Sequence, residues 1–391
     1  MRSIKFPLLV FGVVVSATTS LLPVVAAPLQ SKAAITKTFE RISQSPSLAN
    51  PSIVLLDGGS GEVIFEKNPL SPRKPASVLK LLSTALALQN LDPNLQFETT
   101  ISLGPTPRSL ILAGEFDPWM ASRHVDVVAN NRASLAGLGN KAIEWLIPLE
   151  GGIPRSVSIK YNGVYLADIR ALGDYLKRRG VKAYFVPVSL AQVQEMAIEK
   201  IATVTSPTVR QIVEYALRWS DNLLADRLVE AGAVANGFPR NIEGVDAALR
   251  EFLTEQGIDP SGLFVRDGSG LSKQNRVTAQ MMADLLIKIR ESDVLSPIYD
   301  GLPVSGISGT LQDRFTDTSP DAVGLVHAKT GTLDGTVTLA GYVSSGEDEY
   351  IFVAFADRIK KGITAIKSAR TTLDRLIGKL ASPSLSVLPS E

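Results

Sequence analysis

Apolar runs near both ends of this chain constrain its fold more than any other feature of the sequence. Five runs rich in β-branched or aromatic residues stand out, at residues 52–57, 62–66, 323–328, 337–344 and 350–357. Such runs between turn residues predict β-strands, and the first two, around a glycine turn, predict a hairpin. A helix is expected over 363–380, where Ile366, Leu373 and Ile377 have helical spacing. We therefore expect one sheet built from both ends of the chain.

The long stretch between these ends predicts an insertion. A chain of 391 residues can form two domains, or one domain with a large insertion. Between the two ends lie β-like pieces at 97–103 and 109–113 and a helix at about 164–180, and the pattern becomes helical from 206 to 232. The expected main domain consists of residues 27–95 together with 205–381. The expected inserted accessory domain is 96–204, and a C-terminal tail follows at 382–391.

The first residues have the pattern of an export signal. Arg2 and Lys5 precede an apolar run from Phe6 to Val15, and small residues stand before Ala27. This order predicts a secretory signal over residues 1–26 that is cleaved on export. The alternative is an uncleaved N-terminal anchor, because the hydrophobicity continues to Ala27. Either alternative places the rest of the chain outside the cytoplasm, in the periplasm or cell-wall space.

Composition excludes several classes of function. A net charge of +1 offers no field for nucleic acid or an anionic membrane. The chain has no cysteine, which excludes disulfides, thiol catalysis and thiolate metal sites. Its two histidines, His124 and His327, leave little for a histidine-based zinc site. Hydrolytic chemistry would therefore use hydroxyls, carboxylates or lysines.

The first candidate site is a serine and a lysine three residues apart. Ser77 and Lys80 begin an almost wholly apolar helix over 75–88, and residues three apart share a helical face. A free lysine, with a pKa of about 10.4, is neutral in only about one molecule in 2,500 at pH 7. Burial and a second nearby cation would lower that pKa and let the amine accept the serine proton.

Two further motifs could complete such a site. Lys329, at the end of a predicted strand, would project into a cleft, and Gly331 would let a substrate backbone lie close. The hydroxyls of Thr330 and Thr332 could bind a carboxylate. In Ser220-Asp221-Asn222, a short non-helical connection would turn Ser220 and Asn222 into the cleft and Asp221 away, although a helix N-cap is an equally good interpretation.

Together and in this order, the three motifs resemble the signatures of the penicillin-recognising serine enzymes. The long insertion, the segment 267–272 with Asn275, and the segments 302–306 and 309–311 resemble the D-alanyl-D-alanine carboxypeptidase/endopeptidase family called penicillin-binding protein 4, or peptidase family S13. Two features depart from that family: the insertion is shorter, and Lys273 stands where the family often has an arginine thought to hold a diaminopimelate carboxylate.

The resemblance implies both a fold and a mechanism. The fold is α/β (α+β), with a DD-peptidase/β-lactamase-like antiparallel sheet flanked by helices, a helical lobe and an inserted domain. Ser77 would be acylated by peptidoglycan peptides or β-lactams, with Lys80 as base, and Ser220 would relay a proton to the leaving amine. The backbone amides of Ser77 and Thr332 would form the oxyanion hole. No metal or organic cofactor is needed.

The remaining site roles follow from the same resemblance. Asn222 would hold the substrate amide, and the terminal carboxylate would be gripped by Lys329, Thr330 and Thr332. We expect Asp267 to be structural and His327 to be a neutral packing group. Alternatives are a serine β-lactamase and a non-catalytic wall-binding or β-lactam-sensing module. No Glu-x-x-x-Asn, which class A β-lactamases place after the second motif, follows Asn222.

Overall fold

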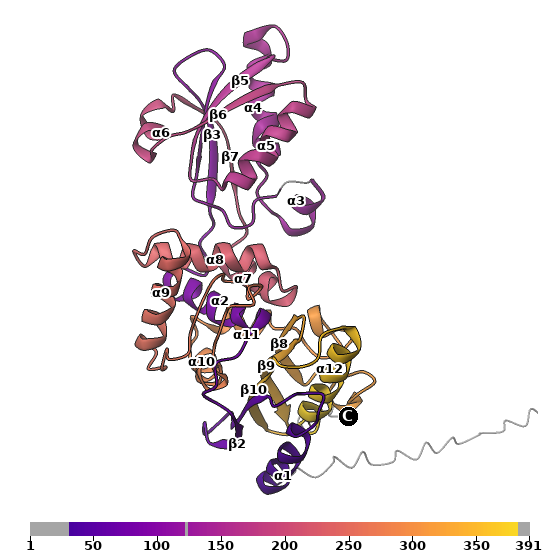
Figure 1. The fold of residues 1–391 in the computed structure, drawn as a ribbon. Coiled ribbons are helices and arrows are strands. Elements are labelled where there is room, and N and C mark those ends of the chain that lie inside the picture. The colour runs from indigo at the N-terminus through magenta and orange to yellow at the C-terminus, as the bar shows by residue number, and fades with distance from the viewer. Residues whose placement is uncertain (1–30, 122–123, 382–391) are drawn as a thin grey trace, which may run out of the picture.

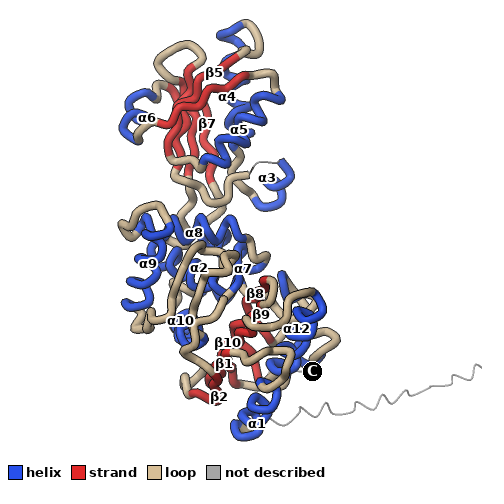
Figure 2. The backbone as a smooth tube through the Cα atoms, viewed as in Figure 1, coloured by secondary structure: helices blue, strands red, loops and turns tan. Residues whose placement is uncertain are grey.

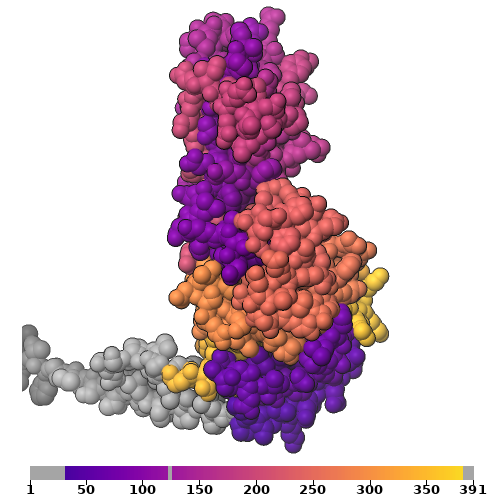
Figure 3. All heavy atoms as spheres, turned by 90° about the vertical axis from the view of Figure 1, so that its left-hand side faces the viewer, coloured from indigo at the N-terminus to yellow at the C-terminus, as the bar shows by residue number. Residues whose placement is uncertain are grey.

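The computed structural model describes residues 31–121 and 124–381 (Figure 1). The predicted signal and the predicted tail lie in segments 1–30 and 382–391, outside the described residues. The molecule is elongated, with the inserted region at one end, a helical layer in the middle and the sheet formed by the chain ends at the other end (Figures 1 and 3).

The chain ends do form one antiparallel sheet, as predicted. Its strand order is β2-β1-β10-β9-β8, so N-terminal β1 pairs directly with C-terminal β10, Ser52 opposite Phe355. The five strands are β1 (Ser52–Asp57), β2 (Val63–Lys67), β8 (Val326–Leu333), β9 (Thr336–Ser345) and β10 (Asp348–Ala356). Strand β8 is at one edge of the sheet. It begins and ends later than the predicted run at 323–328.

Both faces of this sheet are covered by helices, which explains why its strands are apolar at successive positions. Val54 and Leu56 face the core shared with α2 (Leu79–Asn90) and α10 (Ala279–Glu291). Ile53 points the other way, into the core formed with α1 (Lys32–Ser43) and α12 (Ile363–Gly378). Helix α2, which follows Ser77, belongs to the first of these cores and lies between the sheet and the helical layer.

The inserted region contains a second sheet with its own core (Figure 2). The strand order is β6-β5-β4-β3-β7; β4, β5 and β6 are parallel, and β3 is antiparallel to both of its neighbours. The strands are β3 (Glu98–Leu103), β4 (Ser109–Gly114), β5 (Ser156–Asn162), β6 (Lys182–Pro187) and β7 (Glu199–Thr205). Helices α4 (Leu135–Glu150) and α5 (Leu166–Arg178) contribute to this core.

The helical layer lies between the main sheet and the inserted region. It contains α7 (Val209–Arg218), α8 (Asn222–Ala235) and α9 (Ile242–Glu255). Buried Arg227 of α8 forms an ion pair with Asp168 of α5 at 3.0 Å, and its guanidinium lies 4.0 Å from the ring centre of Tyr165.

The other helical segments are α3 (His124–Asn130), α6 (Leu190–Met196), α11 (Ser296–Gly301) and the 3₁₀ turns η1 (Ala76–Val78), η2 (Gly309–Leu311) and η3 (Pro320–Ala322).

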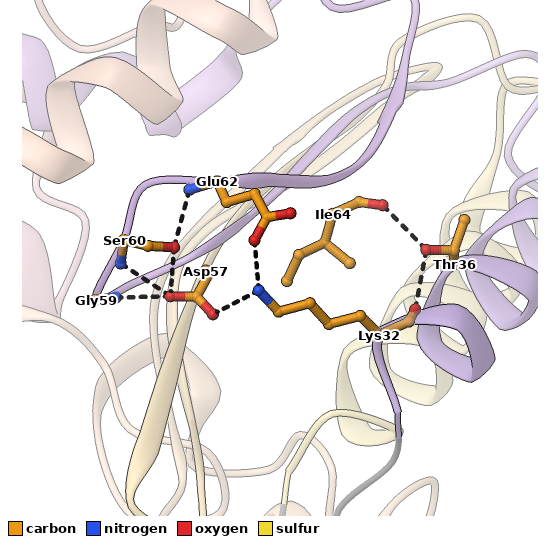
Figure 4. Close-up of polar contacts among 7 residues, drawn as sticks. All are labelled: Lys32, Thr36, Asp57, Gly59, Ser60, Glu62 and Ile64. Atoms are coloured by element: carbon orange, nitrogen blue, oxygen red, sulfur yellow. Dashed lines mark hydrogen bonds and ion pairs between the residues drawn. The ribbon is translucent and has the colours of Figure 1, made fainter.

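Polar contacts fix α1 on the β1–β2 hairpin (Figure 4). The Lys32 ammonium lies 2.5 Å from a carboxylate oxygen of Glu62 and 3.4 Å from one of Asp57. Thr36 donates to the carbonyl of Ile64 at 3.1 Å. These groups are largely exposed, so they orient α1 more than they stabilise it.

Across the described residues, no helix is long and apolar enough to cross a membrane.

A buried ion pair anchors the segment that leads to Ser77. The Arg73 guanidinium contacts a carboxylate oxygen of Asp357 at 3.0 Å, and the side chains are 1% and 7% exposed. Arg73 also donates to the Ser52 hydroxyl at 2.8 Å, and the backbone N–H of Lys74 donates to Asp357 at 3.2 Å. This network joins the start of β1, the end of β10 and the entry to the Ser77 turn.

Removing one partner of this pair should destabilise the fold strongly, because it leaves the other charge buried and unpaired. We expect Arg73→Met to lower the free energy of unfolding by about 3–5 kcal/mol. Lys141→Gln, which removes an exposed ion pair with Glu144, is the control and should cost less than about 1 kcal/mol. Denaturant unfolding would measure both; equal losses would contradict the anchoring role.

Candidate active site

Ser77 lies on a strained turn at the start of α2. The turn is η1, and the preceding Ala76 has φ +46°, a conformation unfavourable for a residue with a side chain. Two glycines allow the surrounding backbone to approach it. A Cβ on Gly270 would lie 1.8 Å from the Ala76 carbonyl oxygen, and one on Gly331 would lie 2.9 Å from the Pro75 carbonyl oxygen. Close packing therefore holds the turn that presents Ser77.

Lys80 is fully buried and has three oxygen partners. Its amine lies 3.0 Å from the Ser77 hydroxyl, 2.7 Å from the side-chain oxygen of Asn222 and 2.7 Å from the backbone carbonyl of Ser269. The three partners come from three different segments of the chain. The amine is thus held against Ser77 by the other two contacts.

Burial lowers the pKa of Lys80 to about 8, against the opposing effect of nearby carboxylates, among them Asp226 and Asp267. Lys329 is also fully buried, and its pKa is lowered well below its usual value by burial and then by the charge of Lys80. The expected lowering of the Lys80 pKa is therefore present, and its main cause is burial. Lys329 is the expected second lysine, and the repulsion between the two charges adds to the effect of burial on the pKa of Lys329.

The second motif, Ser220-Asp221-Asn222, is both a turn that points side chains into the site and a helix N-cap. Ser220 has φ +58°, and its hydroxyl accepts from the Lys329 amine at 2.9 Å. Asp221 is the N-cap of α8 and accepts from the Leu224 N–H at 3.0 Å. Asn222 is already the first residue of the helix rather than part of a non-helical connection. Ser220 and Asn222 contact Lys329 and Lys80, respectively, while Asp221 faces its own helix.

The third motif lies inside β8, not at the end of a strand as predicted. The strand pairing continues through Leu333 because β9 is long enough to accompany it. Gly331 meets the Thr338 hydroxyl and the Ser77 turn, so its missing side chain serves close packing within the protein. Thr330 shares a hydrogen bond with Thr310 at 2.7 Å, and Thr332 accepts from Arg370 at 2.8 Å.

A pocket of about 430 Å³ lies in front of Ser77. Its walls come from the three motifs, from residues 310–314 and from α12, and they consist of Ser77, Ser220, Thr310, Asp313, Arg314, Thr330, Thr332 and Arg370. No sequence motif indicates a role for Asp313, Arg314 or Arg370. Arg370 is on α12, where the apolar spacing predicts a helix, and no local motif marks the exposed residues of that helix.

Two groups that the sequence singled out, Asp267 and His327, lie outside the pocket. Asp267 accepts from the backbone N–H groups of Gly270 and Ser272, both at 2.6 Å, and so shapes the loop whose Ser269 carbonyl holds Lys80. His327 stacks on Tyr299 with ring centres 5.1 Å apart, and burial lowers its pKa. His327 is therefore a packing group outside the pocket.

Comparison with known proteins agrees with this geometry. The profile of the D-Ala-D-Ala carboxypeptidase 3 (S13) family matches residues 35–183 and 146–380. The chain is 27% identical over 383 residues to the carboxypeptidase DacB of Mycolicibacterium smegmatis, covering 86% of this chain and 82% of that protein. It is 36% identical over 163 residues to a D-alanyl-D-alanine carboxypeptidase of an Actinomadura species, covering 39% of this chain and 29% of that protein.

Solved structures share the fold at low sequence identity. Penicillin binding protein 4 from Haemophilus influenzae has a TM-score of 0.67 at 17% identity, covering 88% of this chain and 98% of that one. A predatory peptidoglycan endopeptidase from Bdellovibrio bacteriovorus has a TM-score of 0.59 at 18% identity, covering 85% and 93%. The family profile spans both sheets and the helical layer between them. The chain therefore belongs to the D-Ala-D-Ala carboxypeptidase 3 (S13) family and is a serine-type D-Ala-D-Ala peptidase.

Proposed function

We propose that this peptidase works through an acyl-enzyme on Ser77, with Lys80 as the general base. The observation that carries the proposal is the set of three oxygens around the Lys80 amine. A neutral amine has two hydrogens and one lone pair. The two shorter contacts, to Asn222 and Ser269, would take the hydrogens, so the lone pair would face the Ser77 hydroxyl.

The lowered pKa supports this role. With a pKa of about 8, about one Lys80 in ten is neutral at pH 7, far more than for a free lysine. Ser77 would then attack the carbonyl of the penultimate D-alanine as its proton moves to Lys80. The backbone amides of Ser77 and Thr332 would stabilise the oxyanion, and loss of one such donor costs about 3–4 kcal/mol in other enzymes.

The leaving amine must receive a proton, and Ser220 is our candidate donor. Its hydroxyl lies at the pocket wall and accepts from the Lys329 amine, so a proton passed to the leaving group could be replaced from Lys329. Lys329 would in turn recover the proton that Lys80 took from Ser77, which returns Lys80 to its neutral form. The bond to D-alanine would then break, leaving the acyl group on Ser77. Water would hydrolyse that ester with Lys80 acting again as the base.

Strand β8 offers the substrate a docking edge. It is the last strand of its sheet, so an extended peptide could pair along it. Thr330 and Thr332 would meet the carboxylate beside the scissile bond, and Asn222 would hold the substrate amide. The bound carboxylate would favour the charged form of the buried Lys329. A β-lactam carries a comparable carboxylate and acyl centre and should acylate the same Ser77.

The proposed substrates are peptidoglycan peptides, either with a D-alanyl-D-alanine end or joined through a D-alanyl crosslink. Both are cleaved after a D-alanine, so one site could perform carboxypeptidase and endopeptidase reactions. The proposed place of action is the periplasm or cell-wall space, where these substrates occur. The predicted export signal at residues 1–26 supports this location.

Replacing Ser77 with alanine should abolish the reaction. We expect the wild-type protein to be labelled stably by fluorescent penicillin and to release D-alanine from a D-alanyl-D-alanine peptide, and Ser77→Ala to do neither. Gel fluorescence and D-alanine assay would measure this. Label lost within seconds would indicate a β-lactamase, and labelling of Ser77→Ala would overturn the assignment of the nucleophile.

Replacing Lys80 with methionine should slow acylation, because Ser77 loses its base while the buried volume is nearly kept. We expect Lys80→Met to acylate about 10²–10⁴-fold more slowly. Lys74→Met, whose side chain lies outside the pocket, is the matched control and should react at the wild-type rate. Stopped-flow labelling would measure all three. A Lys80→Met rate within a few-fold of wild type would contradict the role of Lys80.

A further inference from the structure

We infer that Arg370 of α12 binds the substrate carboxylate and makes the enzyme selective for peptides that carry one. This inference deepens the proposed function and rests on it. The relevant carboxylate is on the carbon next to the scissile nitrogen. A terminal D-alanine has this group, and so does the D-centre of a diamino acid in a crosslink, unless it has been amidated.

Arg370 lies where the leaving half of the substrate must be. Its side chain lines the same pocket as Ser77 and Ser220, and its guanidinium donates to the Thr332 hydroxyl at 2.8 Å. Thr332 is on β8, the edge along which the peptide would pair. A carboxylate that reaches the Thr332 hydroxyl is therefore also within reach of the Arg370 guanidinium, whose planar donors suit it.

The arrangement around Arg370 leaves its charge available. Asp374 lies one helical turn further along α12, where it would ordinarily pair with Arg370. Instead, Arg314 contacts both carboxylate oxygens of Asp374. Burial and the charge of Arg314 lower the pKa of Arg370, with Asp374 acting in the opposite direction. A bound carboxylate would relieve the repulsion between the two arginines.

Arg370 also sets the direction of a hydrogen bond. Because the Thr332 hydroxyl oxygen accepts from Arg370, the hydroxyl hydrogen is left to donate. A carboxylate can only accept, so this polarity suits it, whereas the N–H₂ end of a carboxamide would face donors. The site thus opposes an amidated substrate by both charge and hydrogen-bond direction.

A double comparison tests the inference. The wild type, Arg370→Gln and Arg370→Lys would each be assayed with a peptide ending in D-alanyl-D-alanine and with its C-terminal carboxamide. For the wild type, kcat/KM should be about 10- to 100-fold lower for the carboxamide. Arg370→Gln should lose a similar factor with the acid and less than about threefold with the carboxamide, while Arg370→Lys should recover part of the loss.

The control variant is Arg375→Gln, an exposed arginine on the same helix but outside the pocket, which should leave the preference for the acid unchanged. Thermal melting would show that each variant is folded. If Arg370→Gln weakens both substrates equally, or neither, the inference is overturned while the proposed function stands. If the wild type releases no D-alanine from the acid and is not labelled by penicillin, the proposed function fails, and the inference fails with it.

Discussion

The burial of Lys80 against the Ser77 hydroxyl is the interaction on which the rest of this structure depends. Bringing a lysine amine into an apolar interior is costly unless hydrogen bonds satisfy it, and the chain supplies two acceptors besides Ser77. These acceptors come from Asn222 in the helical layer and from the loop shaped by Asp267. Chain segments far apart in the sequence therefore have to meet at one amine.

The contacts that hold this amine and the Ser77 turn in place explain several features that are far apart in the sequence. Arg73 and Asp357 fix the segment entering the Ser77 turn, while Gly270 and Gly331 allow backbone to approach it without side chains. The inserted region folds around its own core and contacts the helical layer through Arg227. The proposed active site thus lies at the junction of sheet and helical layer, apart from the core of the insertion.

Much of the fold could be predicted from the sequence because the main sheet is buried on both faces. Its strands read as apolar runs, and the predicted pairing of both chain ends is confirmed. Strands β5, β6 and β7 of the insertion were not predicted. Strands β6 and β7 have no fully buried side chain and so have no clear pattern. The motif residues could be named in advance, and the structure brings Ser77, Ser220, Thr330 and Thr332 to one pocket. Hydrogen bonds join Lys80 to Ser77 and Asn222, and Lys329 to Ser220. Arg370 could not be found, because its place at the pocket depends on how α12 packs against the sheet.

The most direct test of this account is the pH dependence of Ser77 acylation by a β-lactam, measured between about pH 6 and pH 11. A base acts only when neutral, so a Lys80 pKa lowered by burial predicts that the rate rises with pH and levels off above about 8. A rate that continued to rise toward the ordinary lysine pKa of about 10.4, or one independent of pH, would contradict the claim that burial activates Lys80.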